Sequence, residues 1–466
     1  MKKLHRHNHF AKVTFITCAI FALSFGTWFN FAKPNSRVAN AATMPTVGAP
    51  NITVSTESDL ITAIASAPAG SQYVIAVNGT IELTATLQIP AGDDIALTGG
   101  GVLSGSGNFG DITVNGSLLL ANITVTHDSN SNIGRGVLVN LSTSTLDMLD
   151  GANITNNNGS SGAGVFDSGT FNMWGGIISN NSTATGSGGG VVITNGGTFN
   201  MTGDASITGN SSGNSGAGVY MDNTGGTANS VFNMNSNASI TNNSNTGTIG
   251  TAGVRIAAGI FNMSGGIISN NVSPYDAGGI GNSGTTTISG TAVVSGNSAG
   301  TIGGGIENKA TGTLIINGGT ISGNTAGTYG GGIYNAQGGT VTITSGTISG
   351  NIATTDGGGI YTQDYTALTV SAGVVFANNS AATFSRMSPS DQTLYDAQIA
   401  ATSFSLPIPF NGYNNYDINY NSDLPTDICP YNSSLWKDDT NCVEPTEPTP
   451  PVIPGAPNTG VRFVIK

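Results

Sequence analysis

Charged side chains are scarce in this chain. Only 8 % of the 466 residues are Asp, Glu, Lys or Arg, whereas an ordinary soluble domain has about 25 %. Such a composition excludes a coiled coil or a helix bundle, whose outer faces are rich in charge. It also excludes disorder caused by charge, because 38 % of the residues are apolar. The chain therefore has enough apolar residues to bury a core.

Basic residues and cysteines are rarer still. Six of the 13 basic residues precede residue 42, so the rest of the chain holds seven against 25 acidic residues, a net charge of about −18. This balance excludes a nucleic-acid partner, because phosphate binding requires clustered Lys and Arg. Beyond Cys18 the only cysteines are Cys429 and Cys442, which we expect to form one local disulfide, with two free thiols as the alternative. The spacings typical of zinc ligands do not occur, so we expect no metal and no cofactor.

The N-terminus has the pattern of a secretory signal. Residues 1–12 carry four basic side chains and no acid, and residues 13–31 are almost entirely apolar. Ala39, Asn40 and Ala41 form a small-residue cleavage site. We therefore expect export, a signal peptide over 1–41, and no transmembrane span in the mature chain. An uncleaved anchor is the alternative, because 19 residues nearly span a bilayer.

Glycine is abundant, with 69 residues, and it recurs with a period. A four-residue pattern of Ile or Val, two variable residues and Asn occurs nine times between Ile154 and Asn378. A second pattern, two small residues followed by Gly and then Val or Ile, ends eight to eleven residues after every Asn but the last. The recurring asparagines are Asn157, Asn181, Asn210, Asn243, Asn271, Asn297, Asn324, Asn351 and Asn378.

A unit of about 27 residues with short alternating strands and glycine-rich corners cannot bury its apolar side chains alone, but a stack of such units can. The repeat therefore predicts an all-β fold, a single-stranded parallel β-helix of about 12 coils. Equivalent residues then form columns along the axis, about 4.8 Å apart. We expect Ile and Val to fill the interior and the recurring asparagines to form a hydrogen-bonded ladder.

The segment Ser322 to Ile333, SGNTAGTYGGGI, resembles the repeats of polymorphic outer-membrane proteins and related right-handed β-helix proteins. That family pairs F-x-x-N with G-G-A followed by Ile, Leu or Val, and the resemblance covers Ile154 to Asn378. It implies a right-handed helix and a surface-exposed segment used in adhesion.

The flanks of the repeats differ in composition. Residues 56–67 predict a short helix with Thr56 as N-cap and Asp59 at its third position, whose Ile61 and Ile64 cover the open end of the solenoid. We divide the chain into a signal peptide (1–41), an N-terminal cap with degenerate first coils (42–150), the repeats (151–380), a C-terminal cap with the cysteine pair (381–443), and a Pro-rich spacer with a terminal motif (444–466). Tyrosine-rich binding loops are the alternative for the C-terminal cap.

The terminal motif follows a stiff spacer, EPTEPTPPVIP. The motif consists of Ala456, Pro457, Asn458, Thr459 and Gly460, and it resembles the L-P-x-T-G sorting signal cut by sortases. The resemblance implies cleavage between Thr459 and Gly460, with sortase and cell-wall peptide as partners. Together with the signal peptide, it predicts an extracellular protein at the cell surface or in the cell wall.

Catalytic groups are few. A glycosidase needs two carboxyl groups about 5 to 9.5 Å apart, and the acids of the repeats share no column on adjacent coils. A lyase needs a basic residue, and the repeats contain only Arg255 and Lys309. His127 is the one histidine after the signal segment, and we expect it at the surface. A polysaccharide-active enzyme, similar to pectate lyases or polygalacturonases, is therefore the alternative to a non-catalytic protein.

Aromatic residues point instead to binding. The residue after each glycine pattern faces outward if the preceding Val or Ile faces inward, and this column contains Tyr220, Tyr334 and Tyr361. Tyr334 and Tyr361 are expected to stack on adjacent coils at an exposed face, suited to a cell-surface carbohydrate or a protein ligand. Packing across the coils is the alternative. The sequence thus favours an adhesin or a structural surface stalk.

Overall fold

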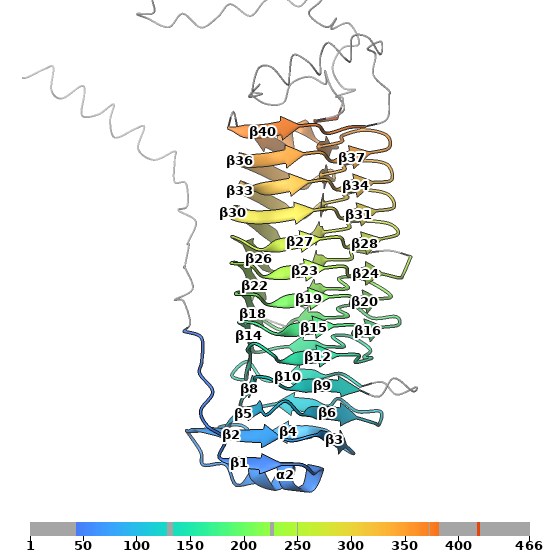
Figure 1. The fold of residues 1–466 in the computed structure, drawn as a ribbon. Helices are drawn as coiled ribbons and strands as arrows, with labels where there is room; N and C mark the ends of the chain where they lie inside the picture. The colour runs from blue at the N-terminus through green and yellow to red at the C-terminus, as the bar shows by residue number, and fades with distance from the viewer. Residues whose placement is uncertain are drawn as a thin grey trace, which may run out of the picture. The chain divides into compact units, whose positions relative to one another are not determined.

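The computed structural model describes residues 43–127, 134–223, 228–248, 250–371, 373–381 and 417–419. The described chain folds into a right-handed parallel β-helix of about 12 turns (Figure 1), as the repeats predict. All strand pairs with an assigned register are parallel. Successive coils therefore pair side by side, and each coil contributes one strand to each face.

The first face of the stack is built from one strand of each coil, and these strands pair in chain order. Its strands are β1 (Ile52–Val54), β2 (Gln72–Val77), β5 (Asp94–Thr98), β8 (Ser117–Leu120), β11 (Thr145–Met148), β14 (Thr170–Met173), β18 (Thr198–Met201), β22 (Val231–Met234), β26 (Ile260–Met263), β30 (Thr285–Ser295), β33 (Thr313–Ser322), β36 (Thr340–Ser349) and β39 (Leu368–Val370).

The second face shares the long strands β30, β33 and β36, which run across the corner and join both faces into one sheet. Its other strands are β3 (Thr80–Leu83), β6 (Val102–Gly105), β9 (Thr124–His127), β12 (Asn153–Thr155), β15 (Ile177–Ser179), β19 (Ser206–Thr208), β23 (Ser239–Thr241), β27 (Ile267–Ser269) and β40 (Val374–Ala377).

A separate sheet, called sheet B below, forms the third face. Its strands are β4 (Leu87–Ile89), β7 (Ile112–Val114), β10 (Val137–Val139), β13 (Val165–Asp167), β17 (Val191–Ile193), β21 (Val219–Met221), β25 (Val254–Ile256), β29 (Ile280–Asn282), β32 (Ile306–Asn308), β35 (Ile333–Asn335) and β38 (Ile360–Thr362).

A sheet of two-residue strands lies just before sheet B in the coils between Ser182 and Ala353. It contains β16 (Ser182–Thr183), β20 (Ser211–Ser212), β24 (Ser244–Asn245), β28 (Val272–Ser273), β31 (Ser298–Ala299), β34 (Thr325–Ala326) and β37 (Ile352–Ala353). The loop from this sheet to sheet B contains the glycine pattern. In this loop Gly332 approaches the next coil so closely that an added Cβ would lie 2.5 Å from Gly359 O, which explains why glycine is required there.

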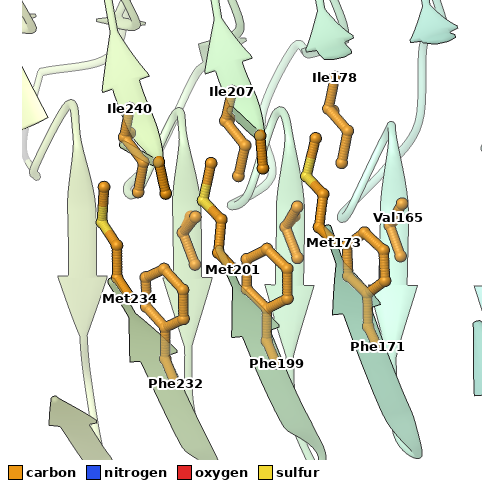
Figure 2. Close-up of a cluster of buried hydrophobic side chains, with 14 of the residues drawn as sticks. Val165, Phe171, Met173, Ile178, Phe199, Met201, Ile207, Phe232, Met234 and Ile240 are labelled. Atoms are coloured by element: carbon orange, nitrogen blue, oxygen red, sulfur yellow. The ribbon is translucent and has the colours of Figure 1, made fainter. Parts of the chain in front are cut away.

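The core is a set of columns of identical residues. Phe171, Phe199, Phe232 and Phe261 are fully buried and stack with ring centroids 4.6 to 4.8 Å apart. Figure 2 shows this column beside the columns of methionine and isoleucine that share the interior. The recurring Phe-Asn-Met segments that supply these side chains are a second repeat signal, which our sequence analysis missed.

The predicted asparagine ladder is confirmed, with one correction. In each rung after Asn157, Oδ1 accepts hydrogen bonds from the backbone N and the Nδ2 of the preceding rung; Asn210 Oδ1 accepts both from Asn181, each at 3.0 Å. The last rung is Asn379 and not Asn378, because Phe376 pairs with Ile348 and shifts the register by one residue. Asn378 instead adopts a left-handed backbone conformation, with φ of 53°.

A short helix covers the first coil. Helix α2 (Glu57–Ala65) begins after Thr56, whose side chain accepts a hydrogen bond from Asp59 N at 3.2 Å. Leu60 and Ile64 are buried against the first coils, but Ile61 is 52 % exposed. The capping helix is thus confirmed, whereas the expected contribution of Ile61 is wrong because that residue lies on the outer side of the helix.

Several sequence predictions fall outside the described residues. These are the signal peptide (1–41), the pair Cys429 and Cys442, the spacer and the sorting-like motif Ala456 to Gly460. Among the described residues, no helix is long and apolar enough to span a membrane.

Candidate functional site

The outward row of sheet B is where the sequence predicts binding residues. Strand pairing places Tyr220 beside Arg255, Arg255 beside Gly281, Gly281 beside Glu307, and Glu307 beside Tyr334. Tyr361 follows Tyr334 on the next coil. The predicted column is therefore real, and it brings aromatic and charged side chains onto one face.

The C-terminal end of this row is a tyrosine cluster formed by Tyr329, Tyr334 and Tyr361. The rings of Tyr334 and Tyr361 are parallel, with centroids 5.3 Å apart, and the ring of Tyr329 lies 4.5 Å from that of Tyr361. The predicted stacking is thus confirmed. However, Tyr334 is only 8 % exposed, so the expectation of an exposed ring is wrong there.

The ring of Tyr361 covers one side of Tyr334, and the loop before β35 lies close to the same residue. An added Cβ on Gly330 of this loop would lie 2.8 Å from Tyr334 Cα. Burial, together with the neighbouring tyrosines and acids, raises the pKa of Tyr334 to about 12. Tyr329 and Tyr361 keep part of their surface accessible, so they are the rings of this cluster that a ligand reaches.

The central part of the row contains a charged cluster formed by Arg255, Asp276, Glu307 and Lys309. The side chain of Glu307 is buried and its Oε1 accepts a hydrogen bond from Lys309 Nζ at 2.5 Å. The same ammonium lies 3.9 Å from Asp276 Oδ2. Arg255 Nη1 donates to Gly281 O at 3.2 Å, over a position that has no side chain.

This cluster corrects the expectation that no two carboxylates of the repeats come together. Asp276 comes from the loop before β29, whereas Glu307 is the middle residue of β32 on the following coil. Because the loops stack in register as the strands do, a loop acid meets a strand acid that shares no column with it. Both carboxylates face one ammonium, and Glu307 is 4 % exposed, so the pair is not an open catalytic dyad.

Burial also affects the ionisation of these groups. Desolvation raises the pKa of Glu307, against the opposing effect of the Lys309 charge. It lowers the pKa of Arg255 and raises that of Tyr220. Glu307 Oε2 is buried and has no hydrogen-bond partner, which leaves this carboxyl as an incompletely satisfied polar group in a chain that has few charges.

A second amide ladder lines the inner side of the same strands. Asn282 Nδ2 donates to Asn308 Oδ1, and Asn308 Nδ2 donates to Asn335 Oδ1, each at 2.8 Å. The sequence left open whether these residues face inward or lie at a turn. They are fully buried, so they form an inward ladder.

His127 is not a surface residue, contrary to expectation. It is 2 % exposed, and its Nδ1 lies 2.6 Å from Asp111 Oδ1, while its Nε2 lies 2.8 Å from Gly107 O. Burial raises the pKa of Asp111 to about 7, although the hydrogen bond and the charge of His127 oppose this. The pair is buried at one corner of the early coils. Asp111 lies 16 residues before His127, so the residues next to His127 in the sequence give no sign of this contact.

Groups of His, Cys, Asp and Glu that could hold a metal ion do not occur in the part of the chain that the structure describes. Comparisons with protein-family models, with curated proteins and with solved structures found no match for this chain.

Proposed function

We propose that this chain is an exported cell-surface protein that acts as a non-catalytic adhesin or structural stalk. The observation that carries the proposal is the tyrosine cluster on the outer side of sheet B, on the wall of a stack of about 12 coils. Tyrosines anchor partners well because they combine a large apolar ring with a polar tip and lose little entropy on binding.

Sequence features outside the described residues support a surface location. The signal-like segment 1–41 would direct export, and the Pro-rich spacer 444–454 would hold the solenoid away from the cell. The motif from Ala456 to Gly460 would serve as a substrate of a sortase, which would join Thr459 to cell-wall peptide. The resemblance of the repeats to those of polymorphic outer-membrane proteins points to the same adhesive role.

The partner is a cell-surface carbohydrate or a protein ligand. Sugar rings stack on tyrosine faces, and the accessible rings of Tyr329 and Tyr361 lie next to each other. The charged cluster lies on the same face, one coil away from Tyr334. A ligand that covers both clusters would contact aromatic rings at one end and charged groups at the other.

An attachment assay tests this role. Beads coated with the full-length chain should adhere to neighbouring cells, and the double variant Tyr329→Ser and Tyr361→Ser should reduce the number of attached beads at least tenfold, because both accessible rings are removed. Ile267→Ser is the matched control: this side chain is 42 % exposed, but it lies on another face. Equal attachment by the double variant and the wild type would show that the tyrosine cluster is not the binding surface.

A further inference from the structure

The charged cluster contains three groups arranged for a reaction within the chain. Lys309 Nζ lies between two carboxylates, 2.5 Å from Glu307 Oε1 and 3.9 Å from Asp276 Oδ2. We propose that Lys309 and Asp276 become joined by an isopeptide bond, with Glu307 as the proton-transfer group. This modification goes beyond the proposed surface role and does not depend on it.

The geometry holds each reactant in place. Thr301 Oγ1 donates to Asp276 Oδ1 at 2.8 Å, which leaves Oδ2 of the same carboxyl directed at Lys309. The backbone N of Lys309 donates to Asn282 O at 2.8 Å, so the start of the lysine side chain is tied to the neighbouring coil. The new bond joins Lys309 Nζ to Asp276 Cγ, and reacting atoms in productive complexes lie about 3 to 3.5 Å apart. The side chains of Lys309 and Asp276 are 29 % and 32 % exposed, so both have room to rotate until Nζ reaches Cγ.

Glu307 has the properties of a proton carrier. It is 4 % exposed, it touches the ammonium directly, and its Oε2 is buried without a partner. Burial also raises its pKa, so its protonated form is more accessible than that of a surface glutamate. A carboxyl in this position takes a proton from the ammonium and returns it to the leaving oxygen.

The reaction balances without any other reagent. Lys309 gives one ammonium proton to Glu307, and the neutral amine attacks Asp276 Cγ. The Cγ–Nζ bond forms as one Cγ–O bond breaks, and the leaving oxygen takes the proton from Glu307 and a second proton from Nζ. The products are an amide and one water molecule, and Glu307 returns to its starting state. High effective concentration within the fold favours this condensation.

The resulting amide links two neighbouring coils. Asp276 lies in the loop that leads to β29, and Lys309 follows β32 on the next coil. A covalent bond between them prevents local separation of these coils. It also removes two opposite charges from the outer side of sheet B.

Trypsin provides a direct test, because it does not cut after an acylated lysine. In the unmodified chain, cleavage at Arg255, Lys309 and Arg386 gives two peptides, 256–309 and 310–386. The proposal predicts one peptide, 256–386, lighter than its sequence by one water molecule. The full-length protein is digested after denaturation and analysed by mass spectrometry.

Variants distinguish the roles of the three groups. Lys309→Arg should restore cleavage at position 309 and show that trypsin reaches this site, and Asp276→Ala should restore the peptide that ends at Lys309. Glu307→Gln should lower the linked fraction at least tenfold. A wild-type peptide ending at Lys309, or a peptide 256–386 at its full sequence mass, would overturn the proposal, and complete linkage in Glu307→Gln would exclude the role of Glu307.

Discussion

At the scale of single residues, the most unusual side chain is a carboxylate inside the solenoid. Asp167 is fully buried in the inward column of sheet B, between Val139 and Ile193. Its Oδ1 accepts a hydrogen bond from Gly169 N, but its Oδ2 has no partner. Burial raises the pKa of Asp167 to about 7, against the effect of that hydrogen bond. Later coils hold asparagine in this column, as at Asn282.

Asp167→Asn should make stability less dependent on pH. Because the pKa of Asp167 is raised, the folded protein binds this proton more tightly than the unfolded chain does. The stabilisation by protonated Asp167 is therefore complete below the unfolded pKa near 4 and is lost as the pH rises to about 7. The loss in the free energy of unfolding is on the order of 4 kcal/mol. The variant does not show this loss, because asparagine does not ionise. Denaturant unfolding at pH 5 and pH 8 should show a variant that gains on the wild type as pH rises.

Asp111 also makes stability depend on pH, because its pKa is raised too. It is present in both the wild type and the variant, so its contribution cancels when their unfolding free energies are compared at the same pH. An identical pH dependence of the two unfolding free energies would show that Asp167 is ionised at no cost in the folded state.

The place of a side chain in the fold could be predicted from the sequence where one residue type recurs in a column. It could not be predicted where the side chain contacts a residue of another column. The asparagine ladder was predicted from its spacing, but the last rung was assigned to Asn378. Phe376 pairs with Ile348, which shifts the register by one residue and makes Asn379 the last rung. The burial of Tyr334 depends on Tyr361 and on the loop before β35, and that of His127 depends on Asp111, which lies just before β7. A single repeat unit contains no signal for such contacts.

At the scale of the element, the asparagine corner is the repeated unit of stability. Asn324 Oδ1 accepts hydrogen bonds from Asn297 N and Nδ2, each at 3.0 Å, and Asn324 Nδ2 donates to Asn351 Oδ1 at 3.0 Å. These groups are fully buried, so water does not replace a lost partner.

Asn324→Ala should therefore lower the free energy of unfolding by about 1 to 3 kcal/mol, because it leaves buried donors and an acceptor unpaired. Asn317→Ala is the matched control, since that side chain is exposed and outside the ladder. Thermal unfolding of both variants tests the claim. If Asn324→Ala melts at the same temperature as Asn317→Ala, the corner does not stabilise the fold.

The strands of the repeats were predictable because their inward residues alternate with polar ones. The column of stacked phenylalanines was not predicted, although Phe-Asn-Met recurs in the sequence. It belongs to strands whose outward asparagines form their own hydrogen-bonded row, such as Asn200 to Asn172 at 2.8 Å. This face repeats with the same period as the isoleucine and glycine columns, from which the strands were predicted.

At the scale of the whole molecule, the parallel stacking followed from the repeat, and the predicted number of coils followed from its nine occurrences together with the degenerate first coils upstream. Each unit buries its apolar residues only against its neighbours, so one unit type requires a solenoid. The sequence could not place the charged cluster, because Asp276 and Glu307 meet through loop stacking and not through repeat position. Nor does a repeat specify a ligand, which depends on the side chains that interrupt it.

The proposal that this solenoid is displayed outside the cell has a direct test. An antibody raised against residues 151–371 is applied to intact cells and to permeabilised cells that produce the full-length chain. The account predicts equal labelling of both, with loss of the label after external protease treatment of intact cells. Labelling that occurs only after permeabilisation, and that resists external protease, would contradict the account.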